Sequence, residues 1–392
     1  MMDVRLLVDV GVLTSVVPAL VITSRVLVRR PDPVRAADRR VSSPAVWLAL
    51  VTGLVYVNQV LFTVYVLRVH GGDPSFIARY LPVGWFDLAS AHPVLRDLAE
   101  HFPAPGLLAP SVLRIQAFLE LPFVLLAFGT VVRWLDADLY RRIARSALLP
   151  MASVSYTAVF CLVEWDLRNP YTVDDVVIRA LSSVVTPLLL AAMAARDTGT
   201  TRVPASVPGL LVFIGSLGTL GALVLVVYDT ALLYNLGRLD DRLPFALAAA
   251  AALLGLRAAA SRLPGRSAPT LSFMVHAIRH WLLLFFVPAL AIRYGLLFGT
   301  PRLALSAAAL TAVAACVRAA REMPTGAEQH PRAALRLTAR IGCAVLAGAV
   351  GAALALRVTP PSYKEVALLT AMGAFLVTGV AVCGLLDRSR RE

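Results

Sequence analysis

Residues 112–134, VLRIQAFLELPFVLLAFGTVVRW, decide the fold class of this chain. The stretch is apolar for long enough to cross the roughly 30 Å hydrocarbon layer of a membrane as a helix. Similar runs, bounded by Arg, Pro and Gly, recur along the whole length. They predict an all-α, polytopic integral membrane protein of about eleven transmembrane helices: 6–28, 45–68, 112–134, 148–166, 176–195, 209–234, 244–258, 271–297, 303–320, 334–356 and 366–386. The run 244–258 is short and alanine-rich, so it either spans fully or lies tilted at the interface.

The composition of the chain agrees with a membrane location. Of its 392 residues 58% are hydrophobic and 16% are charged, whereas soluble domains carry roughly 25% charged residues. The net charge of +13 comes almost wholly from arginine, because Lys364 is the only lysine. These arginines lie between the predicted spans rather than in one patch, so we expect no nucleic-acid partner. Their alternation predicts a multi-pass protein of the cell membrane with its N-terminus outside and its C-terminus inside.

The two parts of the chain, before and after residue 245, differ in the residue composition of their predicted spans. Up to residue 245 the predicted spans hold acids, Asn, Gln, Tyr and Trp, whereas residues 246–392 are rich in Ala and Leu. We therefore predict a polar membrane half, 1–245, with an active cavity, and an apolar membrane half, 246–392. The long loop 69–111, predicted outside, contains Trp85 among aromatics spaced as in short interfacial helices. It serves either as a membrane-surface anchor or as a cap over the cavity.

Three predicted spans each bring one carboxylate toward the predicted outer side: Glu120, Glu164 and Asp229. A charge at the bilayer centre costs about 2.5–3.5 kcal/mol on insertion scales, so these groups are expected to face protein or water. Asn58 and Gln59 add polar groups nearer mid-depth. The sequence therefore predicts one polar cavity shared by several spans.

The fourth predicted span carries a polar face that ends in an acid. Residues three and four apart share one face of a helix, and here they are Ser153, Tyr156, Thr157, Phe160 and Glu164. A snorkelling surface acid is the simpler explanation of Glu164, and a functional acid is the one we favour.

The turn after that span, CLVEWDLRNPYTVDD at residues 161–175, concentrates charge. We interpret it as an external turn whose charged groups, Asp166 and Arg168 among them, gather at the rim of the cavity. Trp165 is either an interfacial anchor or part of the cavity wall. Pro170 keeps Asn169 out of a helix.

Other charged motifs have simpler explanations. Asp175 and Arg179 are four residues apart, which a helix-surface ion pair explains. Asp136 and Asp138 form an Asp-x-Asp pair of the kind that holds a divalent ion on a diphosphate, but a solvated loop is the favoured interpretation.

Histidines and cysteines suggest no metal site. Two histidines four apart bind metal when a third ligand is near, and none is near in sequence, so we predict a basic patch facing headgroups instead. Its residues are His276, Arg279 and His280. The four cysteines lack metal or disulfide spacing. No nucleotide-binding motif is present either, so no metal and no cofactor is expected.

A carboxylic acid kept neutral by burial could deliver a proton to a lipid-soluble substrate. Aromatic faces would then stabilise cationic character. The predicted catalytic residues are Glu164, Glu120, Asp229 and Asp166. The predicted substrate-binding residues are Tyr156, Phe160, Trp165, Arg168, Asn169, Tyr228, Tyr234, Asn58 and Trp85.

With helix-borne Glu and Asp in the first 245 residues and no metal motif, the chain resembles, in kind, the small membrane-integrated terpene cyclases of fungal and bacterial meroterpenoid and indole-terpenoid pathways. The resemblance implies an all-helical, metal-free enzyme that protonates an epoxide or olefin with buried acids. The predicted span count exceeds that family's usual architecture. The expected partners are membrane lipid and a hydrophobic isoprenoid substrate.

Two other functions stay open. A polyprenyl-phosphate-dependent transferase would use Arg114, Arg168 or Arg179 to grip phosphate. A proton-coupled transporter or flippase would use the intramembrane acids as a proton relay, and would need polar residues along a path between both faces.

Overall fold

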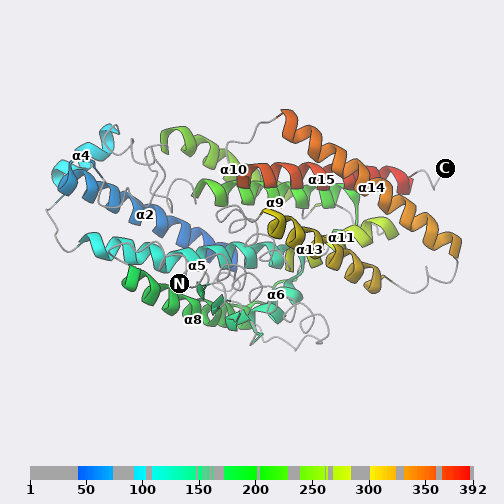
Figure 1. Ribbon diagram of the computed structural model, residues 1–392, viewed down its shortest axis with the longest axis horizontal. Coiled ribbons are helices and arrows are strands. Elements are labelled where there is room, and N and C mark those ends of the chain that lie inside the picture. The colour runs from blue at the N-terminus through cyan, green and yellow to red at the C-terminus, as the bar shows by residue number, and fades with distance from the viewer. Residues whose placement is uncertain are drawn as a thin grey trace. The chain divides into compact units, whose positions relative to one another are not determined.

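The computed structural model describes residues 43–73, 92–102, 108–146, 149–151, 153–154, 157–158, 161, 172–200, 204–227, 239–260, 262–263, 268–283, 301–323, 331–358 and 364–388. Within these ranges all regular structure is helical, which confirms the predicted all-α class. The helices, labelled in Figure 1, are α2 (Pro44–His70), α4 (Pro93–His101), α5 (Leu108–Leu135), α6 (Ala137–Ala144), α8 (Thr172–Arg196), α9 (Val207–Val227), α10 (Leu239–Ala260), α11 (Pro269–Leu283), α13 (Pro301–Glu322), α14 (Pro331–Val358) and α15 (Lys364–Arg388).

Five stretches of helix in the described part of the chain are long and apolar enough to cross a membrane: Pro44–His70, Arg114–Leu135, Val173–Arg196, Val207–Val224 and Leu335–Val358. They coincide with five of the predicted spans. The predicted spans 303–320 and 366–386 lie in helices α13 and α15, and within α10 the apolar helical stretch is the shorter Leu247–Leu256. Eleven spans and the absolute orientation stay predictions.

The chain divides into two compact units. The first unit comprises residues 1–201, 226–243 and 284–308, and the second comprises 202–225, 244–283 and 309–392. The predicted halves 1–245 and 246–392 stay a prediction.

In the first unit α2 packs on α5, and α5 packs on α8. Figure 1 shows α2 and α5 side by side and running in opposite directions, with α4 beside the C-terminal end of α2. Near the other end four helices meet at Gly129 of α5, where an added Cβ atom would lie 3.4 Å from Tyr140, 3.7 Å from Leu190 and 3.7 Å from Pro44. Large side chains fill the space between the helices, Phe62 and Phe123 among them.

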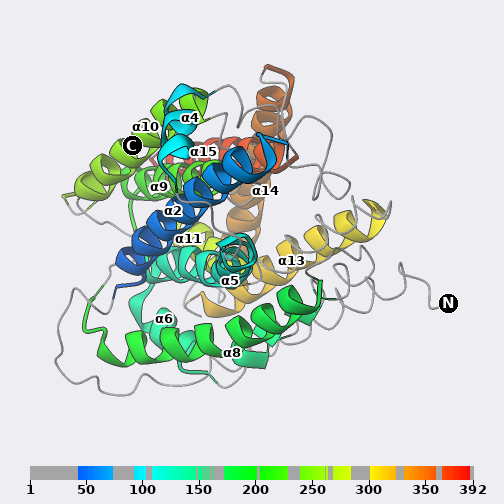
Figure 2. The same ribbon diagram turned by 90° about the vertical axis from the view of Figure 1, so that its left-hand side faces the viewer.

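Helices α5 and α8 run in the same direction. Ion pairs join Arg114 to Asp174 near their first turns and Arg133 to Asp197 near their last. Between α5 and α8 the short helix α6 packs against both, as Figure 2 also shows. These relative directions match those predicted for the spans 45–68, 112–134 and 176–195.

Helix ends in this unit follow local chemistry. Helix α2 stops at Gly71, whose φ of 60° is the left-handed conformation that glycine adopts at low cost. The amide of Gly72 then donates to the carbonyl oxygen of Val66 at 3.1 Å. Asp136 begins α6, because its side chain accepts a hydrogen bond from the amide of Leu139 at 2.9 Å.

The second unit contains a closely packed pair, α14 and α15. A Cβ atom on Gly348 would lie 2.8 Å from the carbonyl oxygen of Phe375, and one on Gly351 would lie 2.3 Å from Oγ1 of Thr378. Only glycine lets the two backbones approach so closely.

Candidate functional site

The first unit contains a layer of buried polar side chains where α2 faces α5. Asn58 and Gln59 on α2, and Gln116 on α5, are each at most 5% exposed. Pro44 of α2 lies beside Gly129 of α5, and every α-helix rises by about 1.5 Å per residue. Because α2 and α5 are antiparallel, a residue that follows Pro44 by a given number of positions is level with the residue that precedes Gly129 by the same number. Asn58 and Gln59 are therefore level with the segment of α5 that carries Gln116.

Gln59 is the exceptional member of this layer. Its side chain is 1% exposed, and neither its amide nitrogen nor its amide oxygen has a hydrogen-bond partner in the structure. A buried polar group left without a partner costs about 1–3 kcal/mol. Such a group in a folded protein calls for an explanation, and a bound ligand is one of the explanations with functional content.

Ion pairs join α5 to α8 at the same level. Nη1 of Arg179 donates to Oε2 of Glu120 at 2.5 Å, and both side chains are at most 16% exposed. Arg114 pairs with Asp174 nearer the helix starts, where both side chains are about half exposed. Arg179 thus pairs with an acid of α5, and the ion pair with Asp175 on its own helix stays a prediction.

On α8 the polar layer also includes hydroxyl groups. Oγ of Ser182 donates to the carbonyl oxygen of Phe118 at 2.8 Å and lies 3.4 Å from Oγ1 of Thr186. The layer therefore draws on three helices, α2, α5 and α8, and contains an acid, a base, amides and hydroxyls.

An apolar belt separates this layer from the other end of the same helices. On α5 the buried side chains between Glu120 and Thr130 are all apolar, with Phe123 and Leu126 the most buried. On α8 the same holds between Thr186 and Asp197. Ten residues of helix correspond to about 15 Å. The described residues of α5 and α8 therefore provide no polar path from one end to the other.

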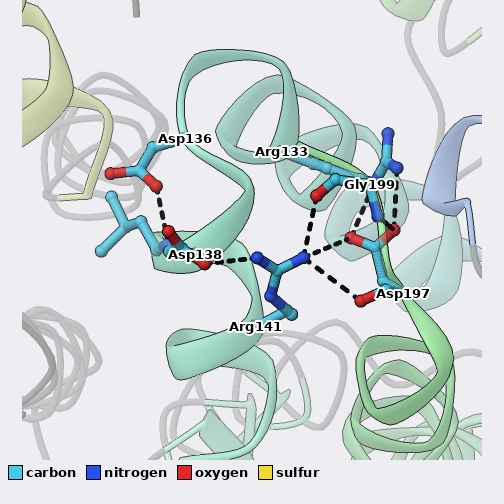
Figure 3. A network of polar contacts seen from close by, with 7 residues as sticks. Arg133, Asp136, Asp138, Arg141, Asp197 and Gly199 are labelled. Atoms are coloured by element: carbon cyan, nitrogen blue, oxygen red, sulfur yellow. Dashed lines mark hydrogen bonds and ion pairs between the residues drawn. The ribbon is translucent and has the colours of Figure 1, made fainter. Parts of the chain in front are cut away.

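Beyond the belt a second polar network surrounds Asp197, which is 1% exposed (Figure 3). Arg133 donates to both of its carboxylate oxygens, from Nε at 3.0 Å and from Nη2 at 2.8 Å. Nη1 of Arg141 donates to the carbonyl oxygens of Asp197 at 3.2 Å and of Gly199 at 2.9 Å. An added Cβ atom on Gly199 would lie 2.2 Å from Nη2 of Arg133. The network therefore links the C-terminal end of α8 to α5 through Arg133 and to α6 through Arg141.

Tyr140 lies beside this network with its ring 2% exposed and its hydroxyl without a hydrogen-bond partner. Burial, together with the charge of Asp197, raises the pKa of Tyr140 above its ordinary value, and Arg133 offsets only part of this. The phenol is therefore neutral at physiological pH, and it contributes packing rather than charge.

Asp136 and Asp138 have structural roles, which corrects the solvated loop that the sequence predicted. Residues 137–144 form helix α6; Asp136 caps it, and Asp138 pairs with Arg141 within it. Figure 3 shows Arg141 reaching to both Asp138 and Asp197. The described residues contain no group of three or more His, Cys, Asp or Glu side chains suited to holding a metal.

Two of the predicted site residues lie in the described part of the chain. Asn58 belongs to the polar layer, and Glu120 is the acid of its central ion pair. The other predicted residues lie outside it: Glu164, Asp229, Asp166, Tyr156, Phe160, Trp165, Arg168, Asn169, Tyr228, Tyr234 and Trp85. A single cavity shared by Glu120, Glu164 and Asp229 stays a prediction.

The polar face expected on the fourth span is visible in part. Ser153 and Thr157 are at most 6% exposed, whereas Met151 and Val154 are about half exposed. The face that carries Ser153 and Thr157 is therefore turned toward protein.

The predicted basic patch lies in the second unit and needs correction. His280 is completely buried, so only His276, at 27% exposed, and Arg279, at 13%, are accessible from outside the protein. The ring nitrogens Nδ1 of His276 and Nε2 of His280 each lie 3.2 Å from Oε2 of Glu322, the last residue of α13, and Nη1 of Arg279 lies 3.9 Å from it. Glu322 follows His280 by 42 residues in the sequence, so a search for nearby ligands missed it.

Comparison with models of known protein families, with curated proteins and with solved structures finds no match for this chain. The fold and the site define a class: an all-helical protein whose apolar helices enclose a polar layer.

Proposed function

We propose that the chain is a multi-pass integral-membrane enzyme that acts on a lipid-soluble isoprenoid substrate, most simply by acid-initiated, metal-independent cyclisation. The polar layer of α2, α5 and α8 is its substrate-binding site. The observation that supports this best is Gln59, whose fully buried amide has no partner for either its donor or its acceptor. A substrate group that accepts from the nitrogen or donates to the oxygen would satisfy it.

The charges around the layer favour a neutral substrate over a phosphorylated one. A transferase that uses a polyprenyl phosphate needs cationic groups to grip the phosphate. Arg114 and Arg179 are both held by carboxylates, Asp174 and Glu120 respectively. Binding phosphate there would require breaking these pairs, which a hydrocarbon with a neutral polar group does not require.

Glu120 has a different role in this proposal from the one the sequence suggested. With an arginine at hydrogen-bond distance, its side chain is the anionic partner of a salt bridge. A fixed carboxylate stabilises positive charge that develops on a nearby substrate carbon. The proton would then come from one of the other predicted acids, Glu164, Asp166 or Asp229.

A proton-coupled transporter is the second candidate, and the Glu120–Arg179 pair is the observation that favours it. An acid and a base that pair inside the membrane form the kind of group that exchanges a salt bridge for a proton. The apolar belt below the pair opposes this function, because transport needs access from both sides.

The test is mass spectrometry of lipid-soluble metabolites from cells that produce the wild type, Gln59→Leu or Thr52→Val and are fed farnesyl and geranylgeranyl compounds and their terminal epoxides. Thr52 is a matched control: it lies on α2, and its hydroxyl already donates to the carbonyl oxygen of Leu48 at 2.7 Å. We expect a product isomeric with its precursor from the wild type and Thr52→Val, and its loss in Gln59→Leu.

A wild type that yields no isomeric product contradicts the cyclase, and altered export of a solute in the same cells would then support the transporter. Equal product from Gln59→Leu and the wild type contradicts the assignment of the polar layer as the binding site.

A further inference from the structure

The second unit contains a cluster of cationic and imidazole groups that the proposed function does not use. His276, Arg279 and His280 are three and four residues apart on α11, so one face of that helix carries them all. They approach a single oxygen, Oε2 of Glu322, from 3.2, 3.9 and 3.2 Å respectively. One carboxylate thus faces a guanidinium and two imidazoles.

The side chains of α11 lie close to Glu322, but their hydrogen-bond geometry is poor. Neither Nδ1 of His276 nor either ring nitrogen of His280 makes an aligned hydrogen bond in the structure. Glu322 is also the last residue of α13, where the negative end of the helix dipole disfavours a carboxylate by about 0.3–1 kcal/mol. The attraction of the α11 groups, rather than the local helix, therefore holds Glu322 in place.

Exposure varies across the cluster in a way that suits a ligand. His280 is 0% exposed and Arg279 is 13% exposed, whereas the side chains of His276 and Glu322 are 27% and 30% exposed. Arg279 and His280 thus lie deeper in the cluster, and His276 and Glu322 are its accessible members. A group that arrived from solvent would meet His276 and Glu322 first and the other two donors behind them.

We propose that His276, Arg279 and His280 form a binding site for a phosphate group, and that Glu322 occupies this site when no phosphate is bound. A phosphate presents several oxygens around one centre, so each donor would bond a different oxygen instead of crowding one. The phosphate belongs either to a free phosphate ion or to a phospholipid headgroup, because both offer the same oxygens to the same donors.

A cation fits this cluster less well. The guanidinium group of Arg279 is positively charged, so it would repel a metal ion placed beside the same carboxylate oxygen. Glu322 adds a carboxylate to the two histidines, but the described residues contain no group of three or more His, Cys, Asp or Glu side chains arranged to hold a metal ion.

The experiment measures binding of inorganic phosphate to the full chain in detergent by isothermal titration calorimetry, at one fixed pH. The variants are Glu322→Gln and Asp387→Asn. Asp387 is a matched control, because it is an acid of the same unit that pairs with an arginine, Arg340, at 3.5 Å. Each substitution changes an acid to its amide and removes a carboxylate from beside one arginine, but only Glu322→Gln opens the proposed site.

We expect saturable phosphate binding to the wild type that becomes about tenfold tighter in Glu322→Gln, as it would if the carboxylate occupies the site about nine-tenths of the time. Asp387→Asn should bind like the wild type, and Arg279→Gln should abolish binding. Absence of saturable binding to the wild type, or equal affinities in Glu322→Gln and Asp387→Asn, would overturn the proposal. If Glu322→Gln fails to fold, Arg279→Gln decides: retained wild-type affinity overturns the site.

A second arm identifies the source of the phosphate. The chain is placed in nanodiscs with and without phosphatidic acid, and inorganic phosphate is titrated again. Competition by phosphatidic acid assigns the site to a lipid headgroup, and unchanged affinity assigns it to free phosphate.

Discussion

The buried carboxylate of Asp197 should contribute more to stability than any exposed acid of the first unit. Asn is the informative substitution, because it keeps the shape of the side chain and one oxygen while removing the charge. Asp197 accepts two hydrogen bonds from Arg133 and one from the amide of Gly199, at 2.8–3.1 Å. A hydrogen bond to a charged group contributes about 1.5–3 kcal/mol. Asn would lose at least one of these bonds.

The loss of charge adds to that cost. Arg133 and Arg141 are at most 19% exposed, and removing one partner of a buried ion pair costs about 3–5 kcal/mol. Arg141 keeps its two backbone acceptors at Asp197 and Gly199, which limits the damage. We therefore expect Asp197→Asn to lower the free energy of unfolding by about 2–4 kcal/mol.

Asp138→Asn is the matched control, because Asp138 also pairs with Arg141 but is 53% exposed. An exposed ion pair contributes about 0–1 kcal/mol. The measurement is equilibrium unfolding of both variants from detergent micelles by SDS, followed by circular dichroism. Equal losses in the two variants, or a loss under about 0.5 kcal/mol for Asp197→Asn, would refute the reasoning from burial.

Three further predictions concern other contacts. Gly348→Ala should destabilise the second unit by about 1–3 kcal/mol in the same unfolding assay, because the added methyl group meets the backbone of α15; unchanged stability would show that α14 and α15 are less closely packed. Burial opposes ionisation of Glu322, but His276, His280 and Arg279 outweigh it and hold the pKa of that carboxyl well below its ordinary value. Its stabilising effect is therefore complete above the unfolded pKa of about 4.3 and is lost as the pH falls toward the folded pKa. In Glu322→Gln the thermal unfolding midpoint of the second unit should accordingly depend less on pH below about 5 than it does in the wild type. An equal dependence on pH in the two proteins would contradict this. Glu120→Gln should cost about 3 kcal/mol by removing the negative charge that the mostly buried Arg179 pairs with on α5, and a double-mutant cycle with Arg179→Gln that shows no coupling would contradict the pairing.

Span positions could be predicted from the sequence because they depend on a local property. A run such as 112–134 must be helical and buried in lipid or protein wherever it lies, since its backbone has no other way to satisfy its hydrogen bonds. The same reasoning explains why the relative directions of three spans agree with the structure. Neither conclusion depends on which helices touch.

Partners across helices could not be predicted in the same way. The sequence places Asp175 one turn from Arg179, and local spacing predicts that pair. It gives no sign that Arg179 also bonds to Glu120, which precedes it by 59 residues. Glu322 was missed for the same reason. Only the packing of α5 on α8, or the fold of the second unit, brings such residues together.

The position of Asp197 in the sequence did contain a signal for a partner elsewhere in the fold. It follows directly after Arg196, the last residue of α8, at the end where the helix dipole disfavours an acid. An acid at such an unfavourable position indicates a compensating cation elsewhere in the fold. The same argument applied to Glu322 at the end of α13 would have suggested a compensating cation, but not that this cation lies on α11.

The ion pairs between α5 and α8 also explain why the polar layer holds its geometry. Parallel helices have no short connecting loop to fix their register, so side chains must do it. Three pairs do so here, at sequence separations of 60, 59 and 64 residues, and Asp197 is far more buried than Asp174. The most buried pair thus lies at the end away from Gln59, and the pair at the opposite end is about half exposed. If the polar layer binds a substrate, as we propose, entry past the half-exposed pair would leave the Asp197 network intact, and that network would keep the register of α5 and α8 fixed.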